Sequence, residues 1–485
     1  MHFGKWFHTS TLLVGLSFVL GGCASVSQTS TPATLDKLLS DPALQGATVS
    51  LMVRDARTGT TLYQHNPRTR LVPASNLKLL TTAAAMDVLG PQYRFATQLL
   101  SNGLRQGDRL TGNLYLRGLG DPSIQFADYQ ALAAQLASQG VRQVQGDLVF
   151  DDTWFDAERL GVDWSHDDET TYYGAQISAL TVAPNTDFDA GSVLVTAKAP
   201  LHVGSPVGVE IYPPTDYLQL NNRAVSGPGN SYGINRRHGT NLLLLSGAVA
   251  PGRQSQQLIS VWEPTQLVAN LFEQALAQQG IKVLGRRVMG GASPAGVTVL
   301  AEHQSAPLQE LIVPLLKLSN NAMSEAVLKA MGRQTASSGT AAAGAVAVAD
   351  FLKRQGLDTS AVSQVDGSGL SRRNLVSSQT LTDLLLAASK QPWFDAWYNA
   401  LPVAGNADRM TGGSLGYRLR GTAAENNLHA KTGSMAGVSS LSGYITDAHG
   451  RKLVFAMLTN NYVVAGAQVK AVENRVAVAL SHSED

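Results

Sequence analysis

The sequence predicts an α+β fold, with one antiparallel sheet sandwiched by helices and a large β-rich insertion. Three observations predict it. A strand hairpin stands near each end of the chain, helical apolar spacing lies between the hairpins, and residues 93–288 consist of short β-rich runs with Gly and Asn turns. Since strands from both ends can pair in one sheet, we predict a discontinuous domain over residues 35–92 and 289–485, interrupted by an insertion over 93–288.

Composition places the chain among globular proteins with more than one core. It has 485 residues, of which 44% are hydrophobic and 15% are charged, and this length and composition support two or three domains. The formal charge of +1 falls to zero without Lys5, which leaves 36 basic and 36 acidic residues. Because there is no basic stripe or tail, the charge pattern argues against nucleic acid as a partner.

The N-terminus has the pattern of an export signal. Lys5 lies in a short basic head, Thr11–Leu20 is an apolar stretch, and small residues follow it. The apolar stretch is too short to span a bilayer. We therefore predict a signal peptide over residues 1–22 and a mature protein in the periplasm or cell envelope.

Cys23 is the only cysteine, so no intramolecular disulfide can form. The stretch Leu20-Gly21-Gly22-Cys23 resembles the bacterial lipobox. This resemblance implies lipidation at Cys23 and a membrane anchor, and Ala24 in place of an aspartate implies the outer membrane. The alternative is an ordinary cleaved signal with an incidental cysteine. The Ser/Thr-rich composition that follows predicts a tether over residues 23–34.

The first folded element that we expect is a hairpin. Ala47–Val53 and Thr60–Gln64 have strand composition and flank a turn. The hairpin leads to Pro73-Ala74-Ser75-Asn76-Leu77-Lys78, which opens an Ala/Leu-rich run that stops at Gly90-Pro91. This pattern predicts a helix that begins close to Ser75.

The spacing of Ser75 and Lys78 suits a nucleophile and its base. Residues three apart share a helix face, so the hydroxyl and the amine can meet one turn apart. A serine hydroxyl needs a neighbouring base, and a desolvated lysine near another cation can be neutral enough to serve. Only Lys78 among the 12 lysines has a serine three residues before it. Taken alone, however, the same pair could be an N-cap serine and a solvated lysine.

Two helices are expected within the insertion, over Tyr129–Gln139 and Thr265–Gln279. Each ends in a similar exit, Gln139-Gly140-Val141-Arg142 and Gln279-Gly280-Ile281-Lys282. The similarity is a weak indication of two related helix-turn-strand units, and the insertion could form two subdomains.

The remainder of the chain is predicted to be helical and then to end in a hairpin and a closing helix. Helical apolar spacing recurs in three segments after Pro307, and strand patterns flank a turn at residues 447–450. The predicted helices are 322–331, 340–354, 379–389 and 466–480, and the predicted strands are 438–446 and 452–458.

Two later stretches supply further polar groups. Ser319-Asn320-Asn321 places a hydroxyl and an amide two residues apart, on the loop before a predicted helix. Lys431-Thr432-Gly433-Ser434 precedes the second hairpin, where Gly433 would let a ligand lie close to the strand backbone. With Ser75 and Lys78, these stretches form the ordered set S-x-x-K, S-x-N, K-T-G, which is typical of serine acyl-transfer enzymes that bind penicillin.

With these motifs the chain resembles the class C low-molecular-mass penicillin-binding proteins, the serine D-alanyl-D-alanine carboxypeptidases/endopeptidases of peptidoglycan. The resemblance extends over nearly all of the mature chain, with Ser319 lying 244 residues after Ser75 and Lys431 112 residues after Ser319. Residues 365–371 and 401–405 look like further family signatures. The resemblance implies a transpeptidase/β-lactamase-like catalytic domain, peptidoglycan stem peptides as substrates and β-lactam antibiotics as inhibitors.

The same resemblance implies the catalytic roles. Ser75 would attack the carbonyl of the penultimate D-alanine while Lys78 takes its proton. Ser319 would relay that proton towards the leaving amine, and Asn321 would bind the substrate amide and position Lys78. Water would then hydrolyse the acyl-enzyme. The net reaction would be removal of terminal D-alanine, cleavage of D-alanyl-diaminopimelate cross-links, or both.

Substrate-binding roles follow from the resemblance as well. Lys431 and Thr432 would hold the terminal carboxylate, and Lys431 would raise the free-energy cost of protonating the base. The backbone N–H groups of the nucleophile and of Ser434, beside Gly433, would form the oxyanion hole. Asp168 aligns with an acid proposed to meet the diaminopimelate side chain, although an acidic run of this kind is also typical of a solvated loop.

Other functions are less consistent with the motifs. A β-lactamase has its first two motifs closer together and needs a deacylating carboxylate, and a non-catalytic cell-wall binding protein would not need a nucleophile and a base. The G-x-S-x-G stretches around Ser231 and Ser414 lack the strand and helix that flank an α/β-hydrolase nucleophile. The ten histidines include no i,i+4 pair, so we expect neither a metal site nor a cofactor.

Overall fold

The structure, a computed structural model, describes residues 31–483. The predicted signal peptide (1–22) and Cys23 lie outside these residues. Helix α1 (Thr31–Leu39) begins inside the predicted tether, so the tether prediction was wrong from Thr31 onward. Among the described residues, no helix combines the length and the apolar character that a membrane span requires.

The two ends of the chain share one five-stranded antiparallel sheet, as predicted. Its strands are β1 (Thr48–Asp55), β2 (Thr61–His65), β20 (His429–Met435), β21 (Val438–Thr446) and β22 (Lys452–Asn460). Their order is β2-β1-β22-β21-β20, so the first hairpin pairs with the last. The K-T-G residues therefore lie within an edge strand, β20, and not merely before a hairpin.

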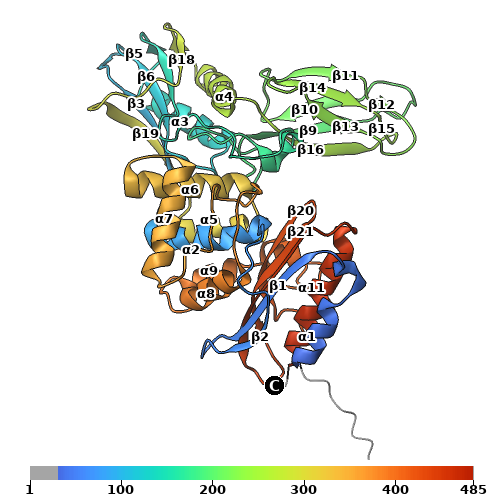
Figure 1. Cartoon of the computed structure of the whole chain (residues 1–485). Helices are drawn as coiled ribbons and strands as arrows, with labels where there is room; N and C mark the ends of the chain where they lie inside the picture. Colours follow the sequence, from blue (N-terminus) through green and yellow to red (C-terminus); the bar gives the residue numbers. More distant parts are fainter. Residues whose placement is uncertain (1–30, 484–485) are drawn as a thin grey trace, which may run out of the picture.

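Helices cover both faces of this sheet (Figure 1). One face carries α1, η1 (Pro42–Leu44) and α11 (Gly466–Ser481). The other face and the layer beyond it contain η2 (Ala74–Leu77), α2 (Lys78–Val88), α5 (Leu308–Lys317), α6 (Asn321–Ala336), α7 (Ala341–Arg354), α8 (Ser378–Ala388), α9 (Phe394–Ala400) and α10 (Arg409–Gly412). The short helix η5 (Gly413–Leu415) lies beside the edge strand β20, and its Leu415 is buried in the same core as α11. The sandwich of sheet and helices matches the predicted fold class.

Helix α2 lies in the middle of the helical layer. All its residues from Lys78 to Met86 are buried, and Leu79 and Leu80 are 0% exposed. A helix that is apolar on all sides must be surrounded by protein. Each fully buried leucine stabilises the fold by about 1.5–3 kcal/mol, and this packing offsets the cost of burying the amine of Lys78.

The insertion forms two lobes at the end of the molecule opposite α1 and α11 (Figure 1). The first lobe contains β3 (Ala96–Ser101), β4 (Arg105–Gln106), β5 (Arg109–Leu110), β6 (Leu114–Gly118), α3 (Phe126–Ser138), β7 (Gln143–Val144), β8 (Leu148–Asp151), α4 (Pro264–Gln278), β17 (Lys282–Val283), β18 (Arg287–Met289) and β19 (Thr298–Gln304). Its sheets have the orders β18-β8-β6-β3-β19 and β17-β7-β5-β4.

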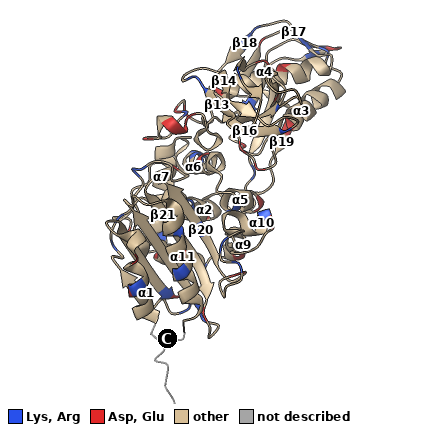
Figure 2. Ribbon diagram, turned by 90° about the vertical axis from the view of Figure 1, so that its right-hand side faces the viewer, with Lys and Arg blue, Asp and Glu red and all other residues tan. Residues whose placement is uncertain are grey.

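The second lobe is smaller and entirely β-rich. It contains β9 (Ser192–Lys198), β10 (Gly208–Tyr212), β11 (Gln219–Asn222), β12 (Val225–Ser226), β13 (Gly233–Arg236), β14 (Leu242–Ser246), β15 (Ala248–Val249) and β16 (Gln254–Ser260). The short helices η3 (His166–Asp168) and η4 (Tyr172–Gly174) precede it. Basic and acidic residues are interspersed over both parts of the molecule in the view of Figure 2.

The insertion ends later than the sequence indicates. Strand β19 pairs antiparallel with β3, from Thr298 opposite Ser101 to Gln304 opposite Ala96. The predicted boundary at residue 288 was therefore wrong, and the insertion continues to Gln304. β19 is an edge strand whose residues are mostly exposed or half-buried, so its assignment depends on a partner about 200 residues away.

The two similar segments that follow helices, residues 139–142 and 279–282, lead into strands that pair with each other. Helix α3 leads into β7 and β8, and α4 leads into β17 and β18. The two pairs of strands run parallel to each other, with Lys282 opposite Gln143 and Arg287 opposite Leu148. Two neighbouring units with the same helix-strand-strand path support the interpretation of the exits as related.

Candidate active site

Ser75 is presented by η2, a short 3-10 helix that continues directly into α2, so helical structure begins close to Ser75 as predicted. Ala74 before it has a left-handed φ of 46°, an uncommon conformation for a residue other than glycine. Asn76 fixes the turn, because its Nδ2 donates to the carbonyl of Lys431 at 3.1 Å and to Ser440 Oγ at 2.7 Å. Tertiary hydrogen bonds therefore place Ser75 beside β20.

Lys78 is the polar centre of the site. Its Nζ lies 3.1 Å from Ser75 Oγ, 2.7 Å from Asn321 Oδ1 and 2.8 Å from the carbonyl of Ser368. Burial lowers the pKa of Lys78 to about 7, against an opposing effect of two nearby carboxylates. A substantial fraction of the amine is therefore neutral near pH 7 and able to accept the serine proton.

The two carboxylates beneath Lys78 belong to Glu325 and Asp366, both buried. Glu325 accepts the backbone N–H groups of Gly367 at 2.9 Å and Ser368 at 2.8 Å, which holds the Ser368 carbonyl against the lysine. Burial, with repulsion from Asp366, raises the pKa of Glu325 to about 7. Residues 365–371, the stretch that looks like a family signature, therefore form the loop whose Ser368 carbonyl contacts the Lys78 amine.

Asp366 also connects this loop to the insertion. It accepts the backbone N–H groups of Gly369 at 2.8 Å and Ser371 at 2.7 Å. Its Oδ2 accepts the indole N–H of Trp164 at 3.0 Å. The acidic segment that follows Trp164 is thus attached to the same loop that supports Lys78.

The second motif lies at the start of α6. Ser319 has a left-handed φ of 61°, a strained conformation of the kind found at functional sites. Asn320 is the N-cap of α6, and its Nδ2 donates to the carbonyl of Phe188 at 2.9 Å. Asn321 donates from Nδ2 to the carbonyl of Tyr173 at 2.9 Å. The insertion therefore holds the S-x-N turn in place.

Lys431 belongs to the third motif, on β20, and its side chain is 0% exposed. Its Nζ donates to Ser319 Oγ at 2.9 Å and to the carbonyl of Thr432 at 2.8 Å. Burial and the neighbouring Lys78 hold the pKa of Lys431 well below its usual value. Because two buried ammonium groups repel each other, an anion bound at Lys431 would favour a charged Lys431 and a neutral Lys78.

Gly433 is required by the packing of the chain itself. A Cβ atom at this position would lie 2.3 Å from Ser440 Oγ, 2.7 Å from the Pro73 carbonyl and 3.0 Å from the Ser75 backbone nitrogen. The glycine therefore lets η2 approach β20, and this approach brings the N–H groups of Ser75 and of the third-motif strand into one region. The atoms nearest to such a Cβ thus belong to the chain itself, to Ser440 on β21 and to the turn that carries Ser75, and the close approach of a ligand at Gly433 stays a prediction.

The two G-x-S-x-G stretches have different positions. Ser231 precedes strand β13 instead of a helix, so the context of a hydrolase nucleophile is absent there. Ser414 lies in η5, and its Oγ is 2.7 Å from Thr432 Oγ1. Ser414 is thus a neighbour of the K-T-G motif, which its sequence pattern did not indicate.

A pocket of about 660 Å³ opens above these groups. Ser75, Ser319, Asn321 and Ser434 line one part of it, and Asp168 lies in the wall that the insertion contributes. Tyr173 donates its hydroxyl to Asp168 Oδ1 at 3.0 Å. Arg372 also lines the pocket and donates from Nη2 to the carbonyl of Ala436 at 2.5 Å.

The structure therefore brings the residues of all three motifs together, with Asp168 in the same pocket. Sequence analysis gave no role to three charged residues of this region, Glu325, Asp366 and Arg372, although Asp366 lies within the 365–371 signature. Glu325 is four residues after Asn321 and so on the same helix face, a signal that the sequence does carry. Arg372 directly follows that signature, which is a local signal for its place near the site.

Comparison with known proteins gives concordant matches. A model of the D-Ala-D-Ala carboxypeptidase 3 (S13) family matches residues 31–483. The chain is 43% identical over 477 residues to the D-alanyl-D-alanine carboxypeptidase of Actinomadura sp. (strain R39), which covers 97% of this chain and 88% of the relative. It is 29% identical over 441 residues to the D-alanyl-D-alanine carboxypeptidase DacB of Haemophilus influenzae, with 88% of each chain covered. The crystal structure of penicillin binding protein 4 (dacB) from Haemophilus influenzae has a TM-score of 0.80 at 25% identity, over 92% of this chain and 99% of that one.

Proposed function

The chain belongs to the D-Ala-D-Ala carboxypeptidase 3 (S13) family, and from this premise we propose that this serine-type D-Ala-D-Ala carboxypeptidase of peptidoglycan works through an acyl-enzyme on Ser75. The observation that carries the proposal is the 3.1 Å contact between Ser75 Oγ and the buried Nζ of Lys78. A neutral amine at this distance can remove the hydroxyl proton as the oxygen attacks the penultimate D-alanine carbonyl.

The remaining motif residues fit the later steps. The backbone N–H groups of Ser75 and Ser434 would stabilise the tetrahedral oxyanion, a contribution of about 3–4 kcal/mol per donor to the barrier. Ser319 Oγ accepts a hydrogen bond from Lys431 Nζ at 2.9 Å and lines the same pocket as Ser75, so it would pass a proton to the departing D-alanine amine. Water then attacks the acyl-enzyme and releases the shortened peptide.

Lys431 and Thr432 would bind the terminal carboxylate of the substrate. The bound carboxylate would keep Lys431 protonated and so suppress protonation of the neighbouring Lys78. In this way substrate binding would itself favour the active form of the base. Ser414, in contact with the Thr432 hydroxyl, would orient that hydroxyl towards the carboxylate.

The charges on the pocket walls indicate which side chain the substrate carries. Asp168, from the insertion, suits an ammonium group, and Arg372, which lines the same pocket, suits a carboxylate. A stem-peptide residue with both groups at its end, such as diaminopimelate, matches this pair. Cleavage of D-alanyl-diaminopimelate cross-links would use the same acyl-enzyme, and we propose it as a second reaction of this site.

Intact mass spectrometry with benzylpenicillin tests the nucleophile. We expect one covalent adduct on the protein and none on Ser75→Ala, with Ser231→Ala, an exposed serine of the insertion, as a matched serine control that still acylates. Hydrolysis of penicillin without an adduct would instead indicate a β-lactamase, and intact penicillin without an adduct would indicate a non-catalytic wall-binding protein. Digestion of purified muropeptides then separates loss of D-alanine from cleavage of cross-links.

We also propose that the protein is exported and anchored to the outer membrane through a lipid on Cys23. The support is the lipobox-like stretch that ends at Cys23. Fractionation of cells that produce the full chain or Cys23→Ser tests it. The full chain should be recovered with outer membranes and the variant in the soluble periplasmic fraction, whereas identical distributions would contradict the anchor.

A further inference from the structure

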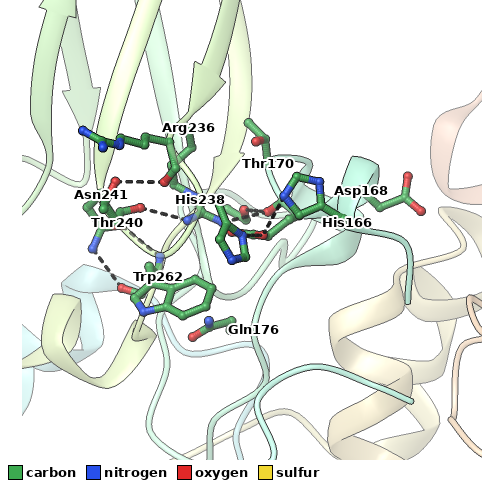
Figure 3. Close-up of polar contacts among 12 residues, drawn as sticks. His166, Asp168, Thr170, Gln176, Arg236, His238, Thr240, Asn241 and Trp262 are labelled. Atoms are coloured by element: carbon green, nitrogen blue, oxygen red, sulfur yellow. Dashed lines mark hydrogen bonds and ion pairs between the residues drawn. The ribbon is translucent and has the colours of Figure 1, made fainter. Parts of the chain in front are cut away.

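Three potential metal ligands meet beside the active-site pocket. The side-chain donor atoms of His166, Glu169 and His238 all lie within 4.8 Å of one another. Figure 3 shows His166 and His238 near each other, with Asp168 pointing away from them. No spacing in the sequence indicated this group, because His238 is 69 residues from Glu169.

The distances suit one ion after a small adjustment. Glu169 Oε2 lies 2.5 Å from His238 Nδ1 and 3.9 Å from His166 Nε2. Ligand atoms of a tetrahedral zinc at about 2.0–2.1 Å are separated from one another by about 3.3 Å, a value between these two distances. The exposed imidazoles can rotate to reach it, since their side chains are 73% and 65% exposed.

Hydrogen bonds fix the position of Glu169 and leave one of its carboxylate oxygens facing the imidazoles. Its Oε1 accepts Arg236 Nη2 at 2.8 Å, and the same nitrogen donates to the Glu169 carbonyl at 3.0 Å. Ser260 also donates to that carbonyl. One carboxylate oxygen is thus occupied by a buried arginine, and the other, Oε2, faces the imidazoles. Partners of this kind orient metal ligands and are typical of built sites.

From this arrangement we propose that His166, Glu169 and His238 bind Zn²⁺ or a similar divalent transition metal ion. Two imidazoles and one carboxylate with an open fourth position are a known zinc ligand set. The ion would displace the His238 to Glu169 contact and take water as its fourth ligand. A cavity of about 180 Å³, lined by these three residues, Trp164 and Asp168, adjoins the site and leaves room for that water.

The ion would connect two separate parts of the insertion. His166 and Glu169 belong to the segment around η3, which supplies Asp168 to the wall of the active-site pocket. His238 follows β13, in the turn before β14 of the second lobe. Metal binding would therefore fix the wall that carries Asp168. This site goes beyond the proposed peptidase reaction, and its test does not depend on activity.

The test is titration of the purified, chelator-treated protein with ZnCl₂ in an isothermal calorimeter. We expect one equivalent to bind, and His238→Ala or His166→Ala to weaken binding at least about tenfold. His202→Ala, which removes another exposed histidine of the insertion, should bind zinc like the unaltered protein. Absence of stoichiometric binding, or equal binding by the His166→Ala/His238→Ala variant, would overturn the site.

Amide hydrogen exchange tests the connection between the two segments. Zinc should slow exchange in residues 163–170 and 236–241 of the unaltered protein and leave both segments unchanged in His238→Ala. Because both histidines are exposed, their substitution should not unfold the protein, and an unchanged exchange pattern elsewhere verifies this. Stoichiometric binding without slower exchange would overturn the proposed fixing of the wall.

Discussion

The Nζ atom of Lys431 lies 2.9 Å from Ser319 Oγ, although the two residues are 112 positions apart in the chain. With the contact between Lys78 and Ser75, this places two buried amines on either side of the reacting region. Their mutual repulsion helps to keep one of them neutral. The chemistry of the site therefore depends on the fold that buries both lysines together.

Acylation should depend on pH through Lys78. Its pKa is lowered to about 7 by burial, and only the neutral amine can take the serine proton. The second-order rate constant for acylation by benzylpenicillin should therefore rise about tenfold per pH unit below pH 7 and level off above it. Stopped-flow measurement between pH 5 and 9 checks this. A profile without an acid limb would contradict the role of Lys78 as base.

Glu325→Gln should shift that profile to lower pH. The Glu325 carboxylate raises the pKa of Lys78, so its removal should lower the pH at which the acylation rate reaches half of its maximum. The amide cannot accept both backbone N–H groups, and stability should fall by about 1–3 kcal/mol, as measured by urea unfolding. Glu310→Gln, an exposed residue on α5, is the control and should change neither quantity. An unshifted pH profile in a folded Glu325→Gln protein would show that the Glu325 carboxylate does not affect the pKa of Lys78.

Gly433→Ala should abolish acylation or slow it at least about a hundredfold. The added Cβ would meet Ser440 Oγ and the backbone of Pro73 and Ser75. The turn that carries Ser75 must then move away from β20, and this separates the two oxyanion donors. Overpacking should also reduce the free energy of unfolding by about 1–3 kcal/mol. Gly233→Ala, where a Cβ would have no neighbour within 4 Å, is the matched control. Normal acylation of Gly433→Ala would show that the two segments can separate without loss of geometry.

Asp168→Asn should affect substrate choice and not β-lactam acylation. If Asp168 binds the substrate ammonium group, loss of its charge should lower kcat/KM about fivefold for a stem peptide with a free diaminopimelate amine, as expected for roughly 1 kcal/mol of ion pairing. The same peptide acetylated on that amine should be cleaved equally by both proteins. Equal losses for the two peptides would assign Asp168 a structural role.

Much of the fold could be predicted because its signals are local. The two terminal hairpins and the helices between them follow from periodicity within each segment, and the structure contains each of them. The prediction failed where pairing is between distant segments. The edge strand β19 is mostly polar, and it is a strand because it pairs with β3. Helix α1 is positioned by packing against α11.

The sequence by itself determined the chemical groups of the site, because the three motifs fix residue types at short spacings that a helix or strand turns into a common face. Only the tertiary structure decided which groups surround them. Glu325 and Asp366 beneath Lys78, Arg372 in the lining of the pocket, and His238 beside Glu169 have their places because separate chain segments pack together. Contacts of this kind depend on the path of the whole chain, and among these residues only Glu325, four residues after Asn321, has a short-spacing signal. The same burial that assembles the site also lowers the pKa of Lys78, so the reactivity of the motif is a property of the fold.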